Sequence, residues 1–142
     1  VITAMENIQS QSTSNPSSIS QAAAEVALNA DQSCIIPMVS AFKERNLFVT
    51  EQLNQINGIR CLSSEGAFYA FADVRQAMED VYKKNLIAAP NDIAFSEYLL
   101  EKAGVAVVPG SALGCEGYMR LSFATSLENL RQALDRIKRL LK

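Results

Sequence analysis

The stretch GYMRLSFATSLENL, residues 117–130, decides how this chain folds because it joins a strand pattern to a helix pattern. Residues 118–123 favour a β-strand, and the apolar stripe that begins at Leu127 predicts an amphipathic final helix. Thr125 and Glu128 have the spacing of a capping box, which predicts where this helix begins. A strand that is followed directly by a helix with a clear start is typical of a domain that contains both α-helices and β-strands.

Arg120 lies in the middle of the predicted strand and is the residue that needs an explanation. Its guanidinium is always charged and carries five donors in a planar fork, which suits two-point capture of a carboxylate or phosphate. The alternative is that Arg120 pairs with a neighbouring Asp or Glu, since most charged side chains are solvated or paired. The strand pattern alone leaves both interpretations open.

The composition is that of a globular protein. The chain has 142 residues, of which 49% are hydrophobic and 20% charged, and this length is enough for one compact unit. With a net charge of -2, the chain has no excess of positive charge that would attract nucleic acid. No apolar run is long enough to span a membrane, and the first residues lack the pattern of a signal peptide. We therefore expect a soluble, cytoplasmic protein that binds neither nucleic acid nor membrane.

The chain contains no histidine, which excludes several kinds of catalytic site. Nucleophile pairs that use a His base and His-based metal sites are ruled out. Cys34, Cys61 and Cys115 are far apart and odd in number, so they predict neither a disulfide framework nor a zinc site. The six lysines lie in polar, helix-like surroundings that predict solvated ammonium groups. No metal site and no catalytic residue are predicted within the chain.

The first half of the sequence has helical periodicity. Residues 1–8 have apolar positions at helical spacing, whereas residues 9–16, QSQSTSNP, are typical of a linker or exposed loop. Ser18 and Gln21 have the spacing of a capping box that predicts an Ala-rich helix to about residue 30. A long helix follows from Ser33 to a C-cap at Gly58, with Pro37 in its first turn or at a kink.

After Gly58 the pattern alternates between strands and helices. Residues 67–71 are apolar at successive positions, which predicts a strand covered on both faces. Asn91 or Asp92 caps a helix that Gly104 ends. The expected elements are strands at 59–62, 67–71, 105–108 and 118–123, and helices at 73–84 and 92–103. Strands interleaved with helices on a small sheet predict a two-layer α+β domain.

Four ordered motifs resemble the end of fold-type I PLP-dependent aminotransferases, most closely the bacterial aspartate aminotransferase subgroup. They are QSQSTSNPSSISQ at 9–21, SEGAFYAF at 64–71, AGVAVVPGSALG at 103–114 and GYMRLSFATSLENL at 117–130. Four motifs that occur in the same order as in the family, over nearly the whole chain, identify the family more specifically than a single motif would. The resemblance implies that residues 33–142 form the small C-terminal domain. Residues 1–32 would be the end of the large PLP-binding domain and the connecting helix.

The resemblance also implies site residues. In the family, the Arg of the R-L-S-F/Y-A segment, here Arg120, holds the α-carboxylate of the substrate. Phe68 would be similar to the aromatic residue that lines the substrate cavity when the small domain closes, although ordinary core packing is an alternative for it. Thr13, Ser14 and Asn15 would belong to a loop near the active site of the partner subunit in a homodimer.

The chain also departs from the family pattern. Nothing in it matches the Ser-x-x-Lys region that carries the Schiff-base lysine, so it resembles the C-terminal third of a transaminase and begins inside a helix. The parent would bind pyridoxal 5'-phosphate (PLP) and move an amino group between L-aspartate, or a similar amino acid, and 2-oxoglutarate. The isolated chain would bind no cofactor and be inactive. The alternative is an aminotransferase-like domain of a transcriptional regulator, or a non-catalytic module that binds small molecules.

Overall fold

The computed structural model describes residues 1–12 and 15–142, which form two compact units, Val1–Ile36 and Pro37–Lys142. The first unit contains helices α1 (Ile2–Ser12) and α2 (Ser18–Asn29). None of its described residues is buried, and large apolar side chains on both helices are exposed. The predicted helix at the start of the chain is confirmed.

Two details of the first unit differ from the sequence prediction. Residues 9–12 continue helix α1 instead of forming a loop, while Thr13 and Ser14 lie outside the described residues. The capping box at the start of α2 is also wrong, because Ser17 is the N-cap and its side chain makes no capping hydrogen bond. The side chain of Gln21 instead donates to the carbonyl oxygen of Pro16 at 2.8 Å.

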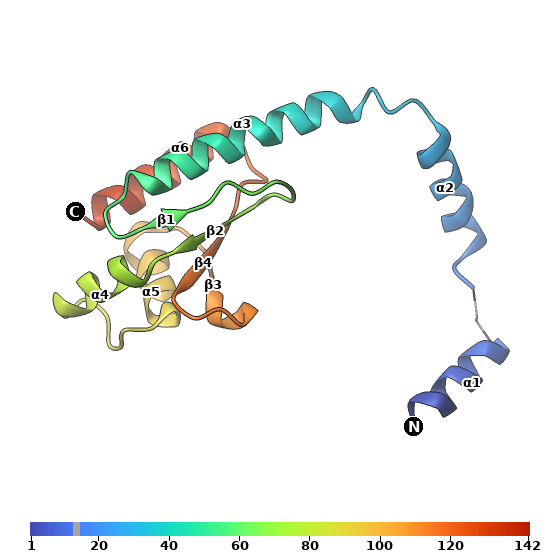
Figure 1. Cartoon of the computed structure of the whole chain (residues 1–142), viewed down its shortest axis with the longest axis horizontal. Coiled ribbons are helices and arrows are strands. Elements are labelled where there is room, and N and C mark those ends of the chain that lie inside the picture. Colours follow the sequence, from blue (N-terminus) through green and yellow to red (C-terminus); the bar gives the residue numbers. More distant parts are fainter. Residues whose placement is uncertain (13–14) are drawn as a thin grey trace. The chain divides into compact units, whose positions relative to one another are not determined.

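The second unit is an α+β domain, as predicted. Figure 1 shows β2 and β4 side by side in its middle, with α3 and α6 above them and α4 and α5 below. In chain order its elements are α3 (Ile35–Asn54), β1 (Arg60–Cys61), β2 (Tyr69–Asp73), α4 (Arg75–Lys83), α5 (Asp92–Tyr98), the π-helical turn η1 (Leu99–Ala103), β3 (Val108–Pro109), the 3-10 helix η2 (Gly110–Leu113), β4 (Tyr118–Ser122) and α6 (Leu127–Leu140). Pro37 lies in the first turn of α3, where its missing N–H costs nothing.

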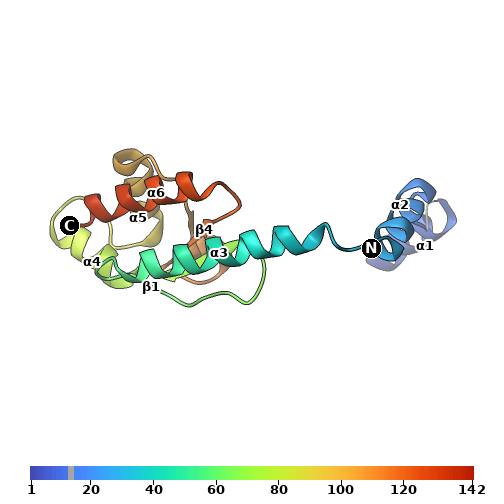
Figure 2. The same cartoon turned by 90° about the horizontal axis from the view of Figure 1, so that it is seen from above.

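The four strands form one antiparallel sheet in the order β1-β2-β4-β3. Buried side chains from α3, α5, η1 and α6 form the core together with alternate residues of β2 and β4. Figure 2 shows α3 and α6 running alongside each other, and the Lys138 ammonium of α6 donates to the Gln55 side chain at the end of α3 at 3.1 Å. Helices α3 and α6 cover one face of the sheet, so the helices form one layer and the sheet forms the other.

The predicted cap at Asn91 and the predicted stop at Gly104 are confirmed, whereas the predicted C-cap at Gly58 is wrong, because α3 already ends at Asn54. Gly104 has a φ of +64° and follows η1, and Asn91 accepts a hydrogen bond from the Ala94 amide at 2.8 Å as the N-cap of α5. The predicted capping box of the final helix is wrong. Ser126, not Thr125, is the N-cap, because its side chain accepts from the Asn129 amide at 3.2 Å.

Two predicted strands are placed differently in the structure. The strand expected at 67–71 begins at Tyr69, because Ala67 has a φ of +59°, which breaks the extended backbone. It is covered on one face only, since Phe71 is 37% exposed. The strand expected at 105–108 is reduced to Val108–Pro109. In each of these two apolar runs only one residue is buried, Ala70 and Val105, so the runs overestimated burial as well as strand length.

Candidate functional site

The outer face of the sheet, the face turned away from the core, carries the site. Residues of β2 and β4 alternate between the two faces: Ala70, Ala72, Met119 and Leu121 are buried, whereas their neighbours are partly or fully exposed. The register places Phe71 opposite Arg120 and Tyr69 opposite Ser122. The outer face of these two strands consists of Tyr69, Phe71, Asp73, Tyr118, Arg120 and Ser122.

Arg120 is half-buried in the middle of β4, with Val108 of β3 and Phe71 of β2 as its neighbours in the register. Its guanidinium carbon lies 4.4 Å from the centre of the Tyr69 ring. Within residues 1–12 and 15–142, no carboxylate forms an ion pair with Arg120. The described part of the chain therefore does not show the alternative in which Arg120 pairs with a neighbouring Asp or Glu.

Phe68 precedes β2 and is 40% exposed, so it is not a core residue. Its ring lies 6.2 Å from the Phe42 ring of α3 and 4.5 Å from the Tyr69 ring, measured between centroids. Its carbonyl oxygen accepts a hydrogen bond from the Phe123 amide at 2.9 Å, which holds the start of β2 beside the end of β4. A ring that is fixed on one side and open on the other suits the lining of a cavity.

Tyr69 is the residue of this site that the sequence analysis did not identify. Its ring contacts both predicted residues, the Arg120 guanidinium and the Phe68 ring. The signal that points to it is the two-residue period of the strand, which places Tyr69 and Arg120 on one face once β2 and β4 are paired. The sequence alone does not provide that pairing.

The remaining predicted residues belong to the other unit. Asn15 is exposed in the unit Val1–Ile36, and Thr13 and Ser14 lie outside the described residues. The structure therefore brings Arg120 and Phe68 together through Tyr69. For Thr13, Ser14 and Asn15, a role in a partner subunit stays a prediction.

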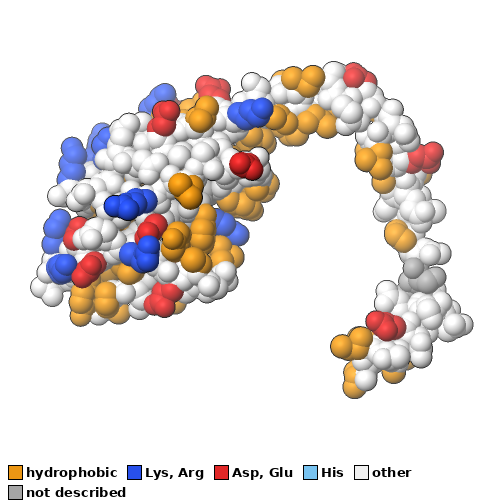
Figure 3. Space-filling view, viewed as in Figure 1, with side chains coloured by type: hydrophobic (Ala, Val, Ile, Leu, Met, Phe, Trp, Pro, Cys, Tyr) orange, Lys and Arg blue, Asp and Glu red, His pale blue; other side chains and the backbone are white. Residues whose placement is uncertain are grey.

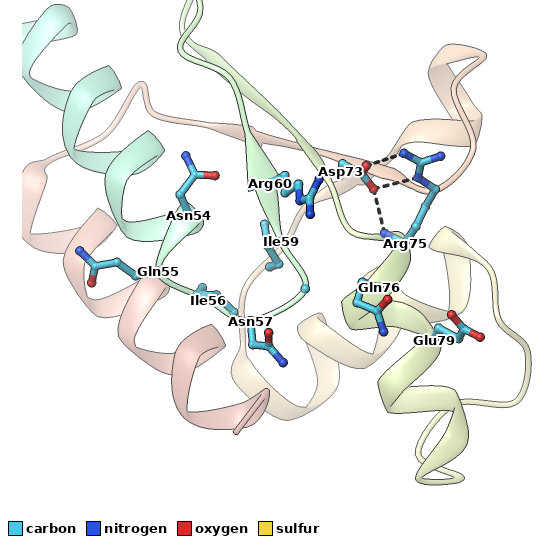
Figure 4. A pocket seen from close by; sticks show the side chains of 11 residues that line it. Asn54, Gln55, Ile56, Asn57, Ile59, Arg60, Asp73, Arg75, Gln76 and Glu79 are labelled. Atoms are coloured by element: carbon cyan, nitrogen blue, oxygen red, sulfur yellow. Dashed lines mark hydrogen bonds and ion pairs between the residues drawn. The ribbon is translucent and has the colours of Figure 1, made fainter.

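Two hollows adjoin the outer face. A groove of about 730 Å³ is lined by Phe71, Tyr118 and Tyr69 and by residues 60–64. A cleft of about 830 Å³ lies between the end of α3 and the start of α4, and Figure 4 shows Arg60, Asp73 and Arg75 along it. Neither hollow is lined by Arg120.

Asp73 and Arg75 form an ion pair at the edge of this cleft. The Arg75 guanidinium donates twice to the Asp73 carboxylate, at 2.6 and 3.0 Å, as the dashed lines of Figure 4 show. These hydrogen bonds lower the pKa of Asp73 below its ordinary value of 3.8, and Asp73 in turn raises the pKa of Arg75. The Arg75 guanidinium is thus paired with a carboxylate, whereas that of Arg120 forms no ion pair within residues 1–12 and 15–142.

Among the described residues, the lysines are spread over the helices and potential metal ligands do not cluster. All six lysines lie on or beside helices, and Lys43, Lys83, Lys84, Lys102 and Lys142 are exposed. Within the described ranges, no lysine lies in a strand of the sheet, and no group of three potential metal ligands comes together. PLP needs a lysine amine and partners for its ring nitrogen and phosphate. Within the described residues, the lysines do not fit such a site.

The surface carries mixed charge. Figure 3 shows Lys and Arg side chains interspersed with Asp and Glu over the visible face of the compact unit, without a single basic patch. This mixed surface agrees with the net charge of -2. In the part of the chain that the structure describes, no helix is long and apolar enough to cross a membrane.

Known proteins match the chain over nearly its whole length. The aspartate/prephenate aminotransferase of Nitrosomonas europaea is 66% identical over 141 residues, which is 99% of this chain and 36% of that protein. A probable aspartate/prephenate aminotransferase of Rickettsia felis is 47% identical over 98% of this chain and 34% of its own length. The chain thus spans about a third of these relatives.

Solved structures agree with the sequence relatives. The crystal structure of the aspartate aminotransferase from Rhizobium meliloti matches 99% of this chain and 35% of its own, with a TM-score of 0.80 and 42% identity. The aspartate aminotransferase from Thermotoga maritima matches 98% of this chain and 32% of its own, with a TM-score of 0.73 and 45% identity. The sequence pattern of the family described as aminotransferase class I and II matches residues 1–137. The chain therefore belongs to the aminotransferase class I and II family.

Proposed function

We propose that the full-length protein is an aminotransferase that moves an amino group between L-aspartate, or a similar amino acid, and 2-oxoglutarate, and that Arg120 holds the α-carboxylate of the substrate. The observation that carries this proposal is the Arg120 guanidinium on the outer face with no carboxylate partner within residues 1–12 and 15–142. Relatives named as aspartate aminotransferases support the class of reaction.

The chemistry of Arg120 suits that role. A carboxylate has two oxygens in a plane, and a guanidinium offers two parallel N–H donors at the matching separation. Holding the carboxylate at two points fixes the orientation of the whole substrate, so the contribution of Arg120 is positioning and not proton transfer. When bound to the parent, PLP would supply the electron sink for the amino transfer.

The other predicted residues complete the proposal. Phe68 would line the substrate cavity with its exposed side, and Thr13, Ser14 and Asn15 would reach the active site of the partner subunit in a homodimer. Phe68 is supported by its partial exposure and by its contact with Tyr69, the neighbour of Arg120. The loop residues are supported by the family resemblance of residues 9–21.

The exposed apolar helices support a domain organisation for the full-length protein. We infer that residues 1–32 belong to the large PLP-binding domain and that residues 33–142 are the small domain. Ile2, Met5, Ile8 and Val26 are each more than 60% exposed, and an apolar surface of this kind usually packs against another part of a protein. The chain alone would be inactive, because it lacks a lysine placed for the cofactor, and mixing it with PLP should give no absorption band of a lysine-bound cofactor.

Replacing Arg120 in the full-length protein tests the proposal. Arg120→Lys keeps the charge but loses the planar fork, so the KM for L-aspartate should rise about 10- to 100-fold, as expected from the loss of about 1.5–3 kcal/mol in a charge-assisted hydrogen bond. Steady-state kinetics with 2-oxoglutarate as acceptor would measure the change.

A matched control separates this effect from a general effect of replacing an arginine by lysine. Arg60→Lys changes an exposed arginine in β1, opposite Asp73 in the register, and should leave the KM unchanged. An unchanged KM in Arg120→Lys would contradict the role of Arg120. A wild-type parent that binds amino acids without producing oxo acids would instead favour a non-catalytic binding module.

A further inference from the structure

Tyr69 connects the two residues of the candidate site. Its ring centre lies 4.4 Å from the guanidinium carbon of Arg120 and 4.5 Å from the centre of the Phe68 ring. In the register Tyr69 is opposite Ser122, so Arg120 is its diagonal neighbour on β4. Diagonal neighbours across two strands are within reach of long and aromatic side chains. The sheet register therefore brings this tyrosine and this arginine into contact.

The contact of Arg120 with Tyr69 differs from the other contacts between arginines and rings in the described residues. The other guanidinium carbons lie farther from their rings: 5.3 Å for Arg45 and Phe42, 5.8 Å for Arg75 and Tyr118, and 5.7 Å for Arg131 and Phe48. Arg75 and Arg131 also form ion pairs with Asp73 and Glu128. Within the described residues Arg45 and Arg120 form no ion pair, and of these two Arg120 has the shorter ring contact.

An arginine without an anion has many side-chain conformations, and binding a carboxylate would have to select one of them. Attraction between the guanidinium charge and the face of an aromatic ring restricts these conformations. The ring accepts no conventional hydrogen bond from the N–H fork. The donors that a carboxylate needs therefore stay available while the charge is held in place.

We propose that Tyr69 is a positioning residue whose ring holds the Arg120 guanidinium ready to bind the substrate carboxylate. This proposal rests on the proposed function, in which Arg120 binds that carboxylate. Tyr69 acts through Arg120 and touches neither the substrate carboxylate nor the reacting atoms. Because the ring restricts Arg120 in advance, Arg120 loses less conformational entropy when the substrate binds. The ring is required for this role, and the hydroxyl group is not.

Three variants of the full-length protein test the proposal. Tyr69→Leu removes the ring, and Tyr69→Phe keeps the ring without the hydroxyl. Tyr82→Leu is the matched control, since Tyr82 is an exposed tyrosine of α4 that does not belong to the outer face of the sheet. The measurements are the KM and kcat for L-aspartate and the dissociation constant of succinate, a dicarboxylate without an amine, by calorimetry.

We expect Tyr69→Leu to weaken succinate binding and to raise the KM about 3- to 30-fold with kcat nearly unchanged, which is the range of a cation–π contact. Tyr69→Phe and Tyr82→Leu should both stay within about twofold of the wild type, because each keeps the ring on Arg120. In the Arg120→Met background, Tyr69→Leu should have no further effect. A purely structural role of Tyr69 would predict a loss that persists in this background, together with a fall in kcat.

The outcomes separate the two proposals. If Arg120→Met leaves succinate binding unchanged, the proposed function of Arg120 fails. If Arg120→Met weakens binding and Tyr69→Leu does not, the role of Tyr69 alone is overturned. The role of Tyr69 is also overturned if Tyr69→Phe loses as much affinity as Tyr69→Leu, because the hydroxyl and not the ring would then carry the effect.

Discussion

The two faces of β4 show how one strand serves both stability and recognition. On the inner face, Met119 is fully buried and Leu121 is 5% exposed, and both belong to the core. On the outer face, Tyr118 and Arg120 are half-buried and contact other side chains in pairs. The contribution of the inner face to stability depends on side-chain volume and on the exclusion of water. Recognition at the outer face depends on charge and on the geometry of the rings. Substitutions on the two faces should therefore affect different properties.

The largest expected effect is on the inner face. Met119→Ala in the 142-residue chain should lower the free energy of unfolding by about 2–5 kcal/mol, because it leaves a cavity in a packed core. Urea denaturation would measure this loss. Ser122→Ala, on the exposed outer face of the same strand, should change stability by no more than about 0.5 kcal/mol. Equal losses for the two variants would contradict the difference between the faces.

A smaller effect is expected at Asp92, which anchors the segment that leads into β4. Asp92 is 1% exposed and accepts a hydrogen bond from the Ser111 amide of η2 at 2.6 Å. Asp92→Ala should cost about 1–3 kcal/mol and speed hydrogen exchange at the Ser111 amide. Asp135→Ala, which removes an exposed carboxylate from α6, is the control. If exchange at Ser111 stayed at the wild-type rate, the anchoring role would be wrong.

The smallest effect concerns acid stability at the outer face. The hydrogen bonds from Arg75 lower the pKa of Asp73 in the folded chain below 3.8, so the unfolded chain takes up this proton at higher pH. The stabilisation is present above the unfolded pKa and is lost as the pH falls through the folded pKa. Asp73→Asn should therefore flatten the decline of the urea midpoint as the pH falls below about 4.

The control for this measurement is Glu65→Gln, which removes an exposed carboxylate that forms no ion pair among the described residues. Its pH profile should follow that of the wild type. A profile of Asp73→Asn that also matches the wild type would show that the Asp73–Arg75 pair contributes nothing, as occurs for many exposed ion pairs.

Local patterns predicted the elements that are specified by nearby residues. The long helix α3, apart from its predicted end at Gly58, the stop at Gly104 and the strand that carries Arg120 are confirmed. Each of them depends on periodicity or on backbone preference within a few residues of the chain. The two-layer α+β class followed from the order of these elements.

The details that depend on distant residues were not predictable. Tyr69 could not be identified because its contact with Arg120 requires the register between β2 and β4, which are separated by more than forty residues. The start of β2 was wrong because Ala67 adopts a positive φ, which a non-glycine residue rarely does. The cap of α6 was misplaced because Thr125 and Ser126 are both good capping residues, and the fold selects Ser126.

The most direct test of the central claim is a crystal structure of the full-length protein with bound succinate. The account predicts that one carboxylate lies on the Arg120 guanidinium with two N–H donors at about 2.7–2.9 Å from its oxygens, while the guanidinium stays on the Tyr69 ring. A succinate carboxylate that is bound by other residues, with Arg120 turned away from it, would contradict the claim that Arg120 binds the substrate.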